Sequence, residues 1–413
     1  MSVAGAARTT DYDIVIVGGG MVGASFALAL RGTPWRALLI EGVAPDSSVQ
    51  PSFDDRTTAL GNGSRQVFEA LGVWHDMAPH AAAIKAIHVS DAGRYGFARL
   101  DAAEQRIDAF GYVVPNRIIG RALWTAVAGA SHLDVLTPAR PVQIDTSPER
   151  VRLTIDTGAA GKRAVTCALA VAADGAQSML RSASGLTAQV EDYDQVAVVV
   201  NIAADRSNDG TAYERFTRTG PLAVLPLPDG SYTVVWSLRP ERAAEVLRLS
   251  DQLFLSELQQ SFGWRAGRLV RVGRRGSYPL KLTRADATIA MRTALIGNAA
   301  QALHPVAGQG FNLGLRDATT LAEILAQRID DPGAQAVLQQ FSDWRARDRR
   351  GMTRFTDSLI KLFADDRPGF ATARNLGLLL FDLLPGAKTA MSRVSWGFAG
   401  RMPRLVRGLP IEP

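Results

Sequence analysis

The sequence has almost no cysteine and little histidine. Cys167 is the single cysteine among 413 residues, which excludes an intrachain disulfide and favours a reducing, cytoplasmic setting. The chain has five histidines, and no group of cysteines and histidines has the spacing of a zinc site. The composition therefore predicts an enzyme or binding protein without a metal centre.

The sequence also lacks an apolar run long enough to cross a bilayer. Its longest apolar stretch, LGLLLFDLLPG from Leu376, is shorter than the ~20 residues that a spanning helix needs, and it contains Asp382. The first residues, MSVAGAARTTDYD, have no apolar segment of the secretory type. We therefore expect neither a transmembrane helix nor a cleaved signal.

Basic residues are spread along the chain and form no concentrated patch before residue 340. The 46 Lys and Arg against 40 Asp and Glu give a net charge of +6, but their scatter argues against a nucleic-acid partner. Near the C-terminus an apolar segment is followed by basic residues and a tryptophan, a pattern typical of a helix on an anionic membrane surface. A helix that caps the core or contacts a partner protein would look the same. The residues concerned are Leu376, Leu378 to Leu380, Phe381, Leu383, Leu384, Lys388, Arg393, Trp396, Arg401, Arg404 and Arg407.

Glycine, in contrast, is plentiful where the chain begins its first regular elements. The stretch DIVIVGGGMVGASFALAL, residues 13–30, reads as a buried strand, a glycine turn and a helix. Gly18, Gly20 and Gly23 have the GxGxxG spacing, which allows a tight turn, a close approach of backbone to pyrophosphate and close packing of helix on strand. This predicts a nucleotide whose phosphates lie at the start of the helix.

A carboxylate follows at the end of the next predicted strand. Glu41 closes RALLIE, 23 residues after Gly18, where it can accept hydrogen bonds from ribose hydroxyls. A 2′-phosphate at this position would be repelled by the same charge.

Two later segments have no counterpart in a simple NAD-binding domain. ALAVAADGAQSMLR, residues 168–181, is a predicted strand that ends at Asp174 and Gly175. The segment from Thr293 is a predicted strand followed by Asn298, a loop with Gly308 and Gly310, and a helix that begins near Asn312. Between these segments, short strands rich in β-branched and aromatic residues predict an antiparallel sheet.

With these features the chain resembles the FAD-dependent aromatic hydroxylases, in particular those of ubiquinone biosynthesis. The similarity lies in the glycine motif, in the Asp-Gly turn with Ser178 and Arg181, and in four blocks: DDRTTAL (54–60), GYVV (111–114), AYERFTRTGPLAVLPL (212–227) and HPVAGQGFNLGLRD (304–317). Most relatives have Asp at the position of Asn298 and His at that of Gln301. The segment GNAAQ, residues 297–301, is similar to the corresponding segment of the 2-polyprenyl-6-methoxyphenol 4-hydroxylase branch.

The resemblance implies an activity and its partners. The cofactor would be FAD, NADPH or NADH would be the cosubstrate, and O₂ would hydroxylate the ring of a polyprenylated methoxyphenol through a flavin hydroperoxide. No second GxGxxG marks a nicotinamide site, which suits a family that binds the dinucleotide transiently. A sister ring hydroxylase of the pathway, a flavin reductase or dehydrogenase acting on prenyl chains, and a non-enzymatic flavin scaffold remain as alternatives. The inner membrane face and other quinone-biosynthesis enzymes are the expected contacts.

The fold implied is α/β, with a three-layer Rossmann-like FAD-binding domain interleaved with an antiparallel-sheet substrate domain and followed by a helical C-terminal part. The FAD-binding domain would comprise residues 11–83, 110–185 and 271–330. Residues 84–109 and 186–270 would form the substrate domain, and residues 331–413 the C-terminal region that faces the membrane.

The resemblance also carries over site residues. Arg56 would contact the cofactor's phosphates, Arg121 lies where relatives often have Gln, and His304 is a candidate base for the phenol, although it could simply orient its loop. Surface arginines and a plain strand-to-helix turn are the alternatives at Arg56, Arg121 and Asp174. The cofactor residues expected are Gly18, Gly20, Gly23, Glu41, Arg56, Arg121, Asp174, Gly175, Asn298, Pro305, Gly308, Gly310, Phe311 and Asn312. Five residues of the antiparallel sheet are expected to form an apolar and aromatic wall around the substrate; the alternative is that they are simply core of the sheet. They are Tyr213, Arg215, Phe216, Pro226 and Trp236.

Overall fold

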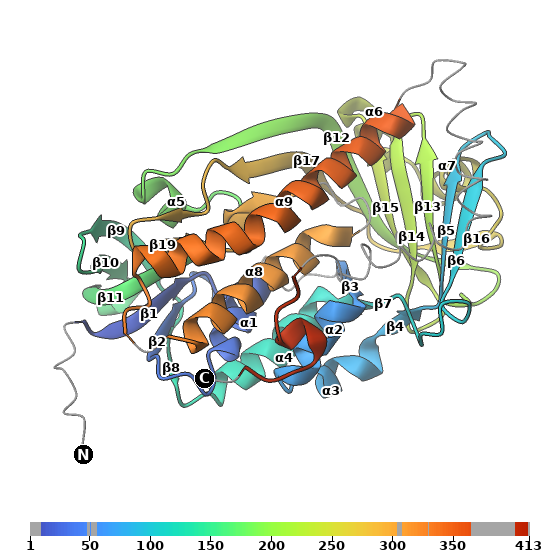
Figure 1. Ribbon diagram of the computed structural model, residues 1–413. Helices are drawn as coiled ribbons and strands as arrows, with labels where there is room; N and C mark the ends of the chain where they lie inside the picture. Colours follow the sequence, from blue (N-terminus) through green and yellow to red (C-terminus); the bar gives the residue numbers. More distant parts are fainter. Residues whose placement is uncertain are drawn as a thin grey trace.

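A parallel sheet forms the centre of the larger part of the molecule (Figure 1). The computed structural model describes residues 10–47, 50, 56–303, 308–328, 330–364 and 401–411, with side chains omitted at 309 and 352–364. The strand order is β18-β19-β11-β1-β2-β8, and β10 and β9 extend β11 as an antiparallel hairpin. The bounds are β1 Tyr12–Val17, β2 Ala37–Ile40, β8 Leu133–Leu136, β9 Arg140–Thr146, β10 Val151–Asp156, β11 Lys162–Ala172, β18 Ile289–Ala290 and β19 Thr293–Leu295.

Both faces of this sheet are covered, each by a different layer. Strand β1 is apolar on both sides, so each side needs a layer that shields it from water. Ile14 and Ile16 pack toward helices α1, α4 and α8, whereas Val15 packs toward the β9–β10 hairpin. The helices on the first side are α1 Met21–Ala29, α2 Asn62–Ala70, α3 Trp74–Met77, α4 Asn116–Ala128 and α8 Gln309–Ala326, and the short α5 Met179–Ala183 lies on the other. The predicted three-layer α/β architecture is confirmed.

A second, mostly antiparallel sheet stands at the other end of the molecule (Figure 1). Its order is β20-β17-β12-β15-β14-β13-β5-β6, and β16 also pairs with β12. The bounds are β5 Ala86–Asp91, β6 Phe97–Asp101, β12 Ala188–Ala204, β13 Thr211–Thr217, β14 Gly220–Pro226, β15 Tyr232–Leu238, β16 Leu269–Val272, β17 Gly276–Ala285 and β20 Gln301–Ala302. Strand β17 pairs with β12, so the boundary expected at residue 271 is wrong: the antiparallel sheet continues to Ala285.

This sheet has one face against helices and the other against a small sheet. Helices α6 Pro240–Arg248 and α7 Asp251–Phe262 cover what we call the outer face, where Val198, Val224 and Trp236 pack against Phe254. The inner face, which carries Ala212, packs on the three-stranded sheet β3-β7-β4. That small sheet comprises β3 Thr57–Gly61, β4 Ala82–Ile84 and β7 Gly111–Pro115.

A long helix and the last described residues close the structure. Helix α9 Gln335–Ala364 runs along α8. The short 3-10 helix Leu405–Arg407 places Leu405 and Val406 in the main core, near α2. Arg401 lies over the Trp344 ring, and Arg404 donates to the Pro410 carbonyl, so these two predicted membrane-facing arginines make contacts within the protein. Arg407, the third arginine of this group, is exposed at the end of the 3-10 helix. Residues 376–396, which hold the other members of the predicted apolar and basic segment, lie outside the described residues. The remaining 3-10 helices are Ala78–His80, Gly158–Ala160 and Gly297–Ala299.

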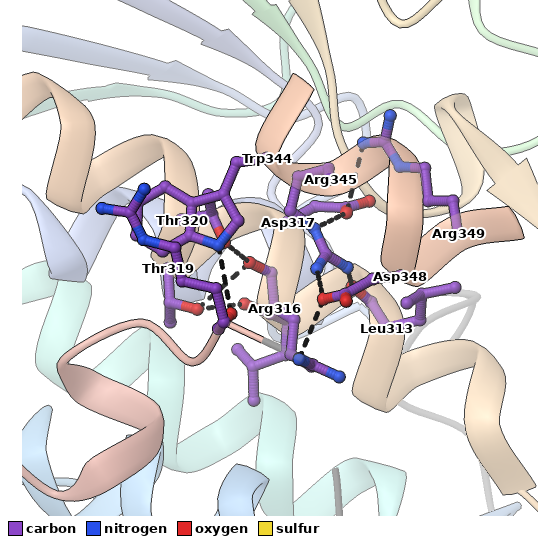
Figure 2. A network of polar contacts seen from close by, with 11 residues as sticks. Leu313, Arg316, Asp317, Thr319, Thr320, Trp344, Arg345, Asp348 and Arg349 are labelled. Carbon is purple, nitrogen blue, oxygen red and sulfur yellow. Dashed lines mark hydrogen bonds and ion pairs between the residues drawn. The ribbon is translucent and has the colours of Figure 1, made fainter. Parts of the chain in front are cut away.

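A buried ionic network fastens α9 to α8 (Figure 2). The Asp317 carboxylate of α8 accepts a hydrogen bond from Arg345 Nε of α9 at 2.8 Å, and both side chains are 0% exposed. Asp348 pairs with Arg345 and, at 2.9 Å, with Arg316. Burial lowers the pKa of Arg316 to about 10, still well above neutrality, so this guanidinium stays charged and depends on the Asp348 carboxylate. The network holds the helix that begins at the predicted cofactor loop.

The described part of the chain lacks two kinds of feature. No helix there is long and apolar enough to cross a membrane. No group of three or more His, Cys, Asp or Glu side chains in those residues could hold a metal ion.

Candidate active site

The first glycine motif makes a turn that only glycine fits. Gly18 has a φ of +102°, and a Cβ there would lie 2.5 Å from the Ala173 carbonyl oxygen. A Cβ on Gly23 would lie 1.9 Å from the Gly18 carbonyl oxygen. Helix α1 therefore starts directly against the ends of β1 and β11, and its first-turn N–H groups have no intrahelical acceptor. This is the geometry of an anion site.

Two side chains fix the middle of this turn. The Glu41 carboxylate accepts the Gly19 N–H at 2.6 Å and the Val43 N–H at 2.9 Å. Trp124 Nε1 of α4 donates to the Gly19 carbonyl at 3.0 Å. Glu41 stands at the end of β2 as predicted. Trp124 was not predicted from the sequence to belong to the site. The one feature of the sequence that could have indicated it is its position on the same helix as the predicted Arg121, one turn later.

The second predicted segment forms a turn beside the first. Asp174 follows β11, accepts the N–H groups of Met179 and Leu180 with Oδ2 and so caps α5, while its buried Oδ1 has no hydrogen-bond partner among the described residues. Gly175 adopts a φ of +86°. Arg181 joins this turn to the next one by donating to the Ala299 carbonyl at 2.9 Å.

The third segment brings Asn298 and the start of α8 to the same end of the sheet. Asn298 is exposed in the turn after β19. Val22 of α1 lies against Gly297 and Gly314. A Cβ added to Gly297 would lie 3.1 Å from a methyl carbon of Val22, and a Cβ added to Gly314 would lie 2.9 Å from the Gly297 Cα. The N-termini of α1 and α8 therefore lie side by side near the carboxyl ends of β1 and β11.

At the start of α8 the glycines and Asn312 have different tasks. Gly308 caps the helix with a left-handed φ of +60°, and Gly310 has open space where a Cβ would project. Asn312 accepts from the Gly61 N–H and Ser64 Oγ and donates to the Ala59 and Gly308 carbonyls, so its side chain is fully used within the protein. Phe311 stacks on Phe68 with centroids 6.1 Å apart. Backbone N–H groups are what this helix start can offer a ligand.

The two predicted arginines lie around this end of the sheet. Arg56 precedes β3 and is exposed, with its guanidinium carbon 5.5 Å from the centroid of the Tyr278 ring. Arg121 is exposed on α4, the helix that carries Trp124. His304 and Pro305 lie outside the described residues.

These residues fit FAD. The glycine turn and Glu41 suit an ADP moiety, the exposed Asn298 amide and the unpartnered Asp174 Oδ1 can hydrogen-bond hydroxyls or amines, and the open space at Gly310 leaves room for a planar ring. The N-terminus of α8 would stabilise negative charge on that ring.

The predicted substrate wall is not assembled as expected. Side chains alternate along β13, β14 and β15, and Tyr213, Arg215, Pro226 and Trp236 fall on the outer face. Tyr213 packs edge-on against Phe262 of α7, and Arg215 donates to the Ser261 carbonyl. Phe216, in the same strand register as Ala212, is the one of the five on the inner face.

The inner face is the side that meets the cofactor loop. Ala59 of β3 packs with Ala212 and Leu225 of this face, and its own Cβ lies 3.1 Å from the point that a Cβ on Gly308 would occupy. The small sheet therefore joins the inner face to the start of α8. A ring substrate between them would be shielded from water on the sheet side.

Comparisons with known proteins agree with this geometry. The profile of the family described as FAD binding domain matches residues 11–356. Ubiquinone hydroxylase UbiL of Rhodospirillum rubrum is 34% identical, with 97% of this chain and 93% of that protein covered. The 3-demethoxyubiquinol 3-hydroxylase of Escherichia coli is 29% identical, with 89% and 94% covered.

A solved structure gives the same fold. The p-nitrophenol 4-monooxygenase PnpA of Pseudomonas putida has a TM-score of 0.77 and 21% identity, covering 94% of this chain and 98% of that one. The chain thus belongs to the FAD-binding-domain family and, within it, to the FAD-dependent hydroxylases of the ubiquinone-biosynthesis type.

Proposed function

We propose that this protein hydroxylates the ring of a polyprenylated methoxyphenol in ubiquinone biosynthesis, with NADPH or NADH and O₂ as cosubstrates. The observation that carries the proposal is the whole-length match to ubiquinone hydroxylases on a fold whose glycine turns suit FAD. The branch that hydroxylates a 2-polyprenyl-6-methoxyphenol is favoured by the GNAAQ segment that contains Asn298.

The chain's own part in the reaction is to bind, orient and shield. Bound FAD would take a hydride from the nicotinamide and pass one oxygen atom of O₂ to the ring. Gly18 to Gly20 and Glu41 would hold its ADP end, and the N–H groups at Gly310 and Phe311 would face the polar edge of its ring. The apolar inner face would exclude water from the substrate.

Turnover with a defined phenol tests the proposal. We expect the purified protein to retain FAD and to consume NAD(P)H and O₂ in equal amounts only when a short-chain 2-prenyl-6-methoxyphenol is present, with a hydroxylated product seen by mass spectrometry. NAD(P)H oxidation without O₂ incorporation would instead support a reductase. Quinone precursors that accumulate in a strain without the protein would identify the ring position and separate the sister hydroxylase.

We further propose that the segment from Leu376 to Arg393 brings the protein to the cytoplasmic face of an anionic membrane, where a prenylated substrate dissolves. Because Leu405 and Val406 are core residues, truncation would also damage the fold. We therefore expect Leu379→Asp/Leu380→Asp to lower flotation with vesicles containing anionic lipid, while Leu253→Asp on the exposed side of α7 leaves it unchanged. Equal flotation of all three proteins would contradict membrane binding by this segment.

A further inference from the structure

One carboxyl group stands on the inner face of the antiparallel sheet with no described residue to pair with. Glu214 lies at the centre of β13, two residues from Ala212, and points to the same side. Its neighbours across the strands are Ala223 of β14 and Val89 of β5, and Val235 of β15 comes next along the row. The carboxyl group therefore has an apolar surrounding on the side of the sheet that meets the cofactor loop.

The ionisation of Glu214 is governed by burial alone. Its side chain is half-buried, and no hydrogen bond or ion pair joins it to another described residue. Burial raises the pKa of Glu214 to about 7. The adjacent strand β5 places Asp91 on the same face, two residues from Val89, and this carboxyl group does not contribute to the shift. Tyr278 of β17, which lies under Arg56, is on the same face but four strands away from β13. A structural carboxylate would be expected to have a partner.

We infer that Glu214 is the general base that takes the phenolic proton of the ring substrate, an inference that rests on the proposed hydroxylase function. The proton passes from the phenol oxygen to a carboxylate oxygen of Glu214, which leaves the phenolate electron-rich for attack by the oxygen that FAD, NAD(P)H and O₂ supply. As the new C–O bond forms, the O–O bond breaks, and the other oxygen atom leaves as water, which takes up the proton that the ring loses when it regains aromaticity. Glu214 then returns its proton to the product oxygen. The residue is unchanged over a turnover.

Glu214 is better placed to act as this base than the residues that were expected to line the substrate. Tyr213 and Arg215, the neighbours of Glu214 in β13, point to the outer face, where Tyr213 packs against Phe262 of α7 and Arg215 donates a hydrogen bond to the carbonyl of Ser261. Glu214 instead faces the side on which Ala59 connects the sheet to Gly308. A base needs a pKa near the working pH, and a half-buried carboxyl among valines and alanines has one without help from a second residue.

The test compares Glu214→Gln and Glu214→Asp with Glu191→Gln, which removes an exposed carboxylate from β12 of the same sheet. With short-chain 2-prenyl-6-methoxyphenol, we expect Glu214→Gln to lower kcat/KM by about 10²- to 10⁴-fold and Glu214→Asp to lower it less. A ring-fluorinated analogue, whose phenol is more acidic, should recover much of the loss. In the wild type, kcat/KM should fall as the pH drops below about 7, the pKa of the free base, and Glu214→Gln should lack this dependence.

Two readouts do not depend on turnover. Binding of a ring-fluorinated phenol with a pKa close to 7, from which a carboxylate of similar pKa can take the proton at equilibrium, should produce phenolate absorbance in the oxidised holoenzyme of the wild type and of Glu191→Gln but not of Glu214→Gln. Without cofactor, the ionised carboxylate destabilises the folded state, and this cost begins above the unfolded pKa and is complete above about pH 7. Glu214→Gln should therefore melt at a higher temperature than the wild type at pH 8, and the difference should close near pH 5.

The outcomes separate this inference from the proposed function. Wild-type hydroxylation together with an unchanged pH profile and phenolate spectrum in Glu214→Gln would overturn the role of Glu214 alone. An equal loss with both phenols and unaltered phenolate absorbance would assign Glu214 a structural role and also overturn it. A wild type that binds no phenol and hydroxylates none would overturn the proposed function itself. A His304→Ala variant with the same loss of phenolate absorbance as Glu214→Gln would assign the proton to His304 and overturn the role of Glu214.

Discussion

Gly23→Ala is expected to yield a protein that no longer retains FAD and whose free energy of unfolding is lower by about 1–3 kcal/mol or more. A Cβ at position 23 would lie 1.9 Å from the Gly18 carbonyl oxygen and 3.0 Å from the Ala173 Cβ. Both obstacles belong to elements fixed by the parallel sheet, so helix α1 must move away from β1. Its N-terminal N–H groups then leave the position where they would meet the pyrophosphate. Flavin absorbance after gel filtration and urea denaturation measure the two effects.

Two other glycines serve as controls for that change. Gly129 ends α4, and the atoms nearest to a Cβ added there would be 3.8 Å away, so Gly129→Ala should keep both FAD and stability. Gly310 has open space where its Cβ would project, so Gly310→Ala should leave the cofactor-free protein as stable as the wild type but weaken FAD binding. If Gly23→Ala purifies with a full complement of FAD, the steric account of the first turn is wrong.

The residues around the first turn could be predicted because their signals are local. The strand, the three glycines and Glu41 lie within 30 residues, and each turn requires a particular residue type. The αL conformation of Gly308 and the cap formed by Asp174 are likewise properties of short segments. The parallel sheet that brings them together follows from the order of strands and helices.

The faces of the antiparallel sheet could not be predicted in the same way. Alternation in AYERFTRTGPLAVLPL shows that Tyr213 and Glu214 point to opposite sides, but not which side α6 and α7 cover. That choice depends on helices some 30 to 50 residues later in the chain, at 240–262. Tyr213 and Trp236, expected in a wall for a phenol, lie in the core under α6 and α7, whereas Phe216 and the acidic Glu214 face inward. Trp124 was missed because its partner, the Gly19 carbonyl, is distant in sequence.

Asp317→Ala is expected to lower the free energy of unfolding by about 3–5 kcal/mol, because it leaves a buried arginine without its counter-ion. Asp317 accepts a hydrogen bond from Arg345 and lies 3.1 Å from Arg349, and the Arg345 side chain has no access to water. With one carboxylate removed, Asp348 alone would face three arginines of α8 and α9. Helix α8 would then loosen at its packing on α9, and FAD retention should fall with stability, which urea denaturation and flavin absorbance would measure together.

A matched surface pair and a double variant show whether charge burial is the cause. Glu245→Gln removes a partner of Arg242 on the surface of α6, and a change of less than about 1 kcal/mol is expected. Asp317→Leu combined with Arg345→Met replaces the buried pair by apolar side chains of similar size and should recover much of the stability lost in Asp317→Ala. If the double variant is no more stable than Asp317→Ala, the loss arises from packing and hydrogen bonds at α8 rather than from the unpaired charge.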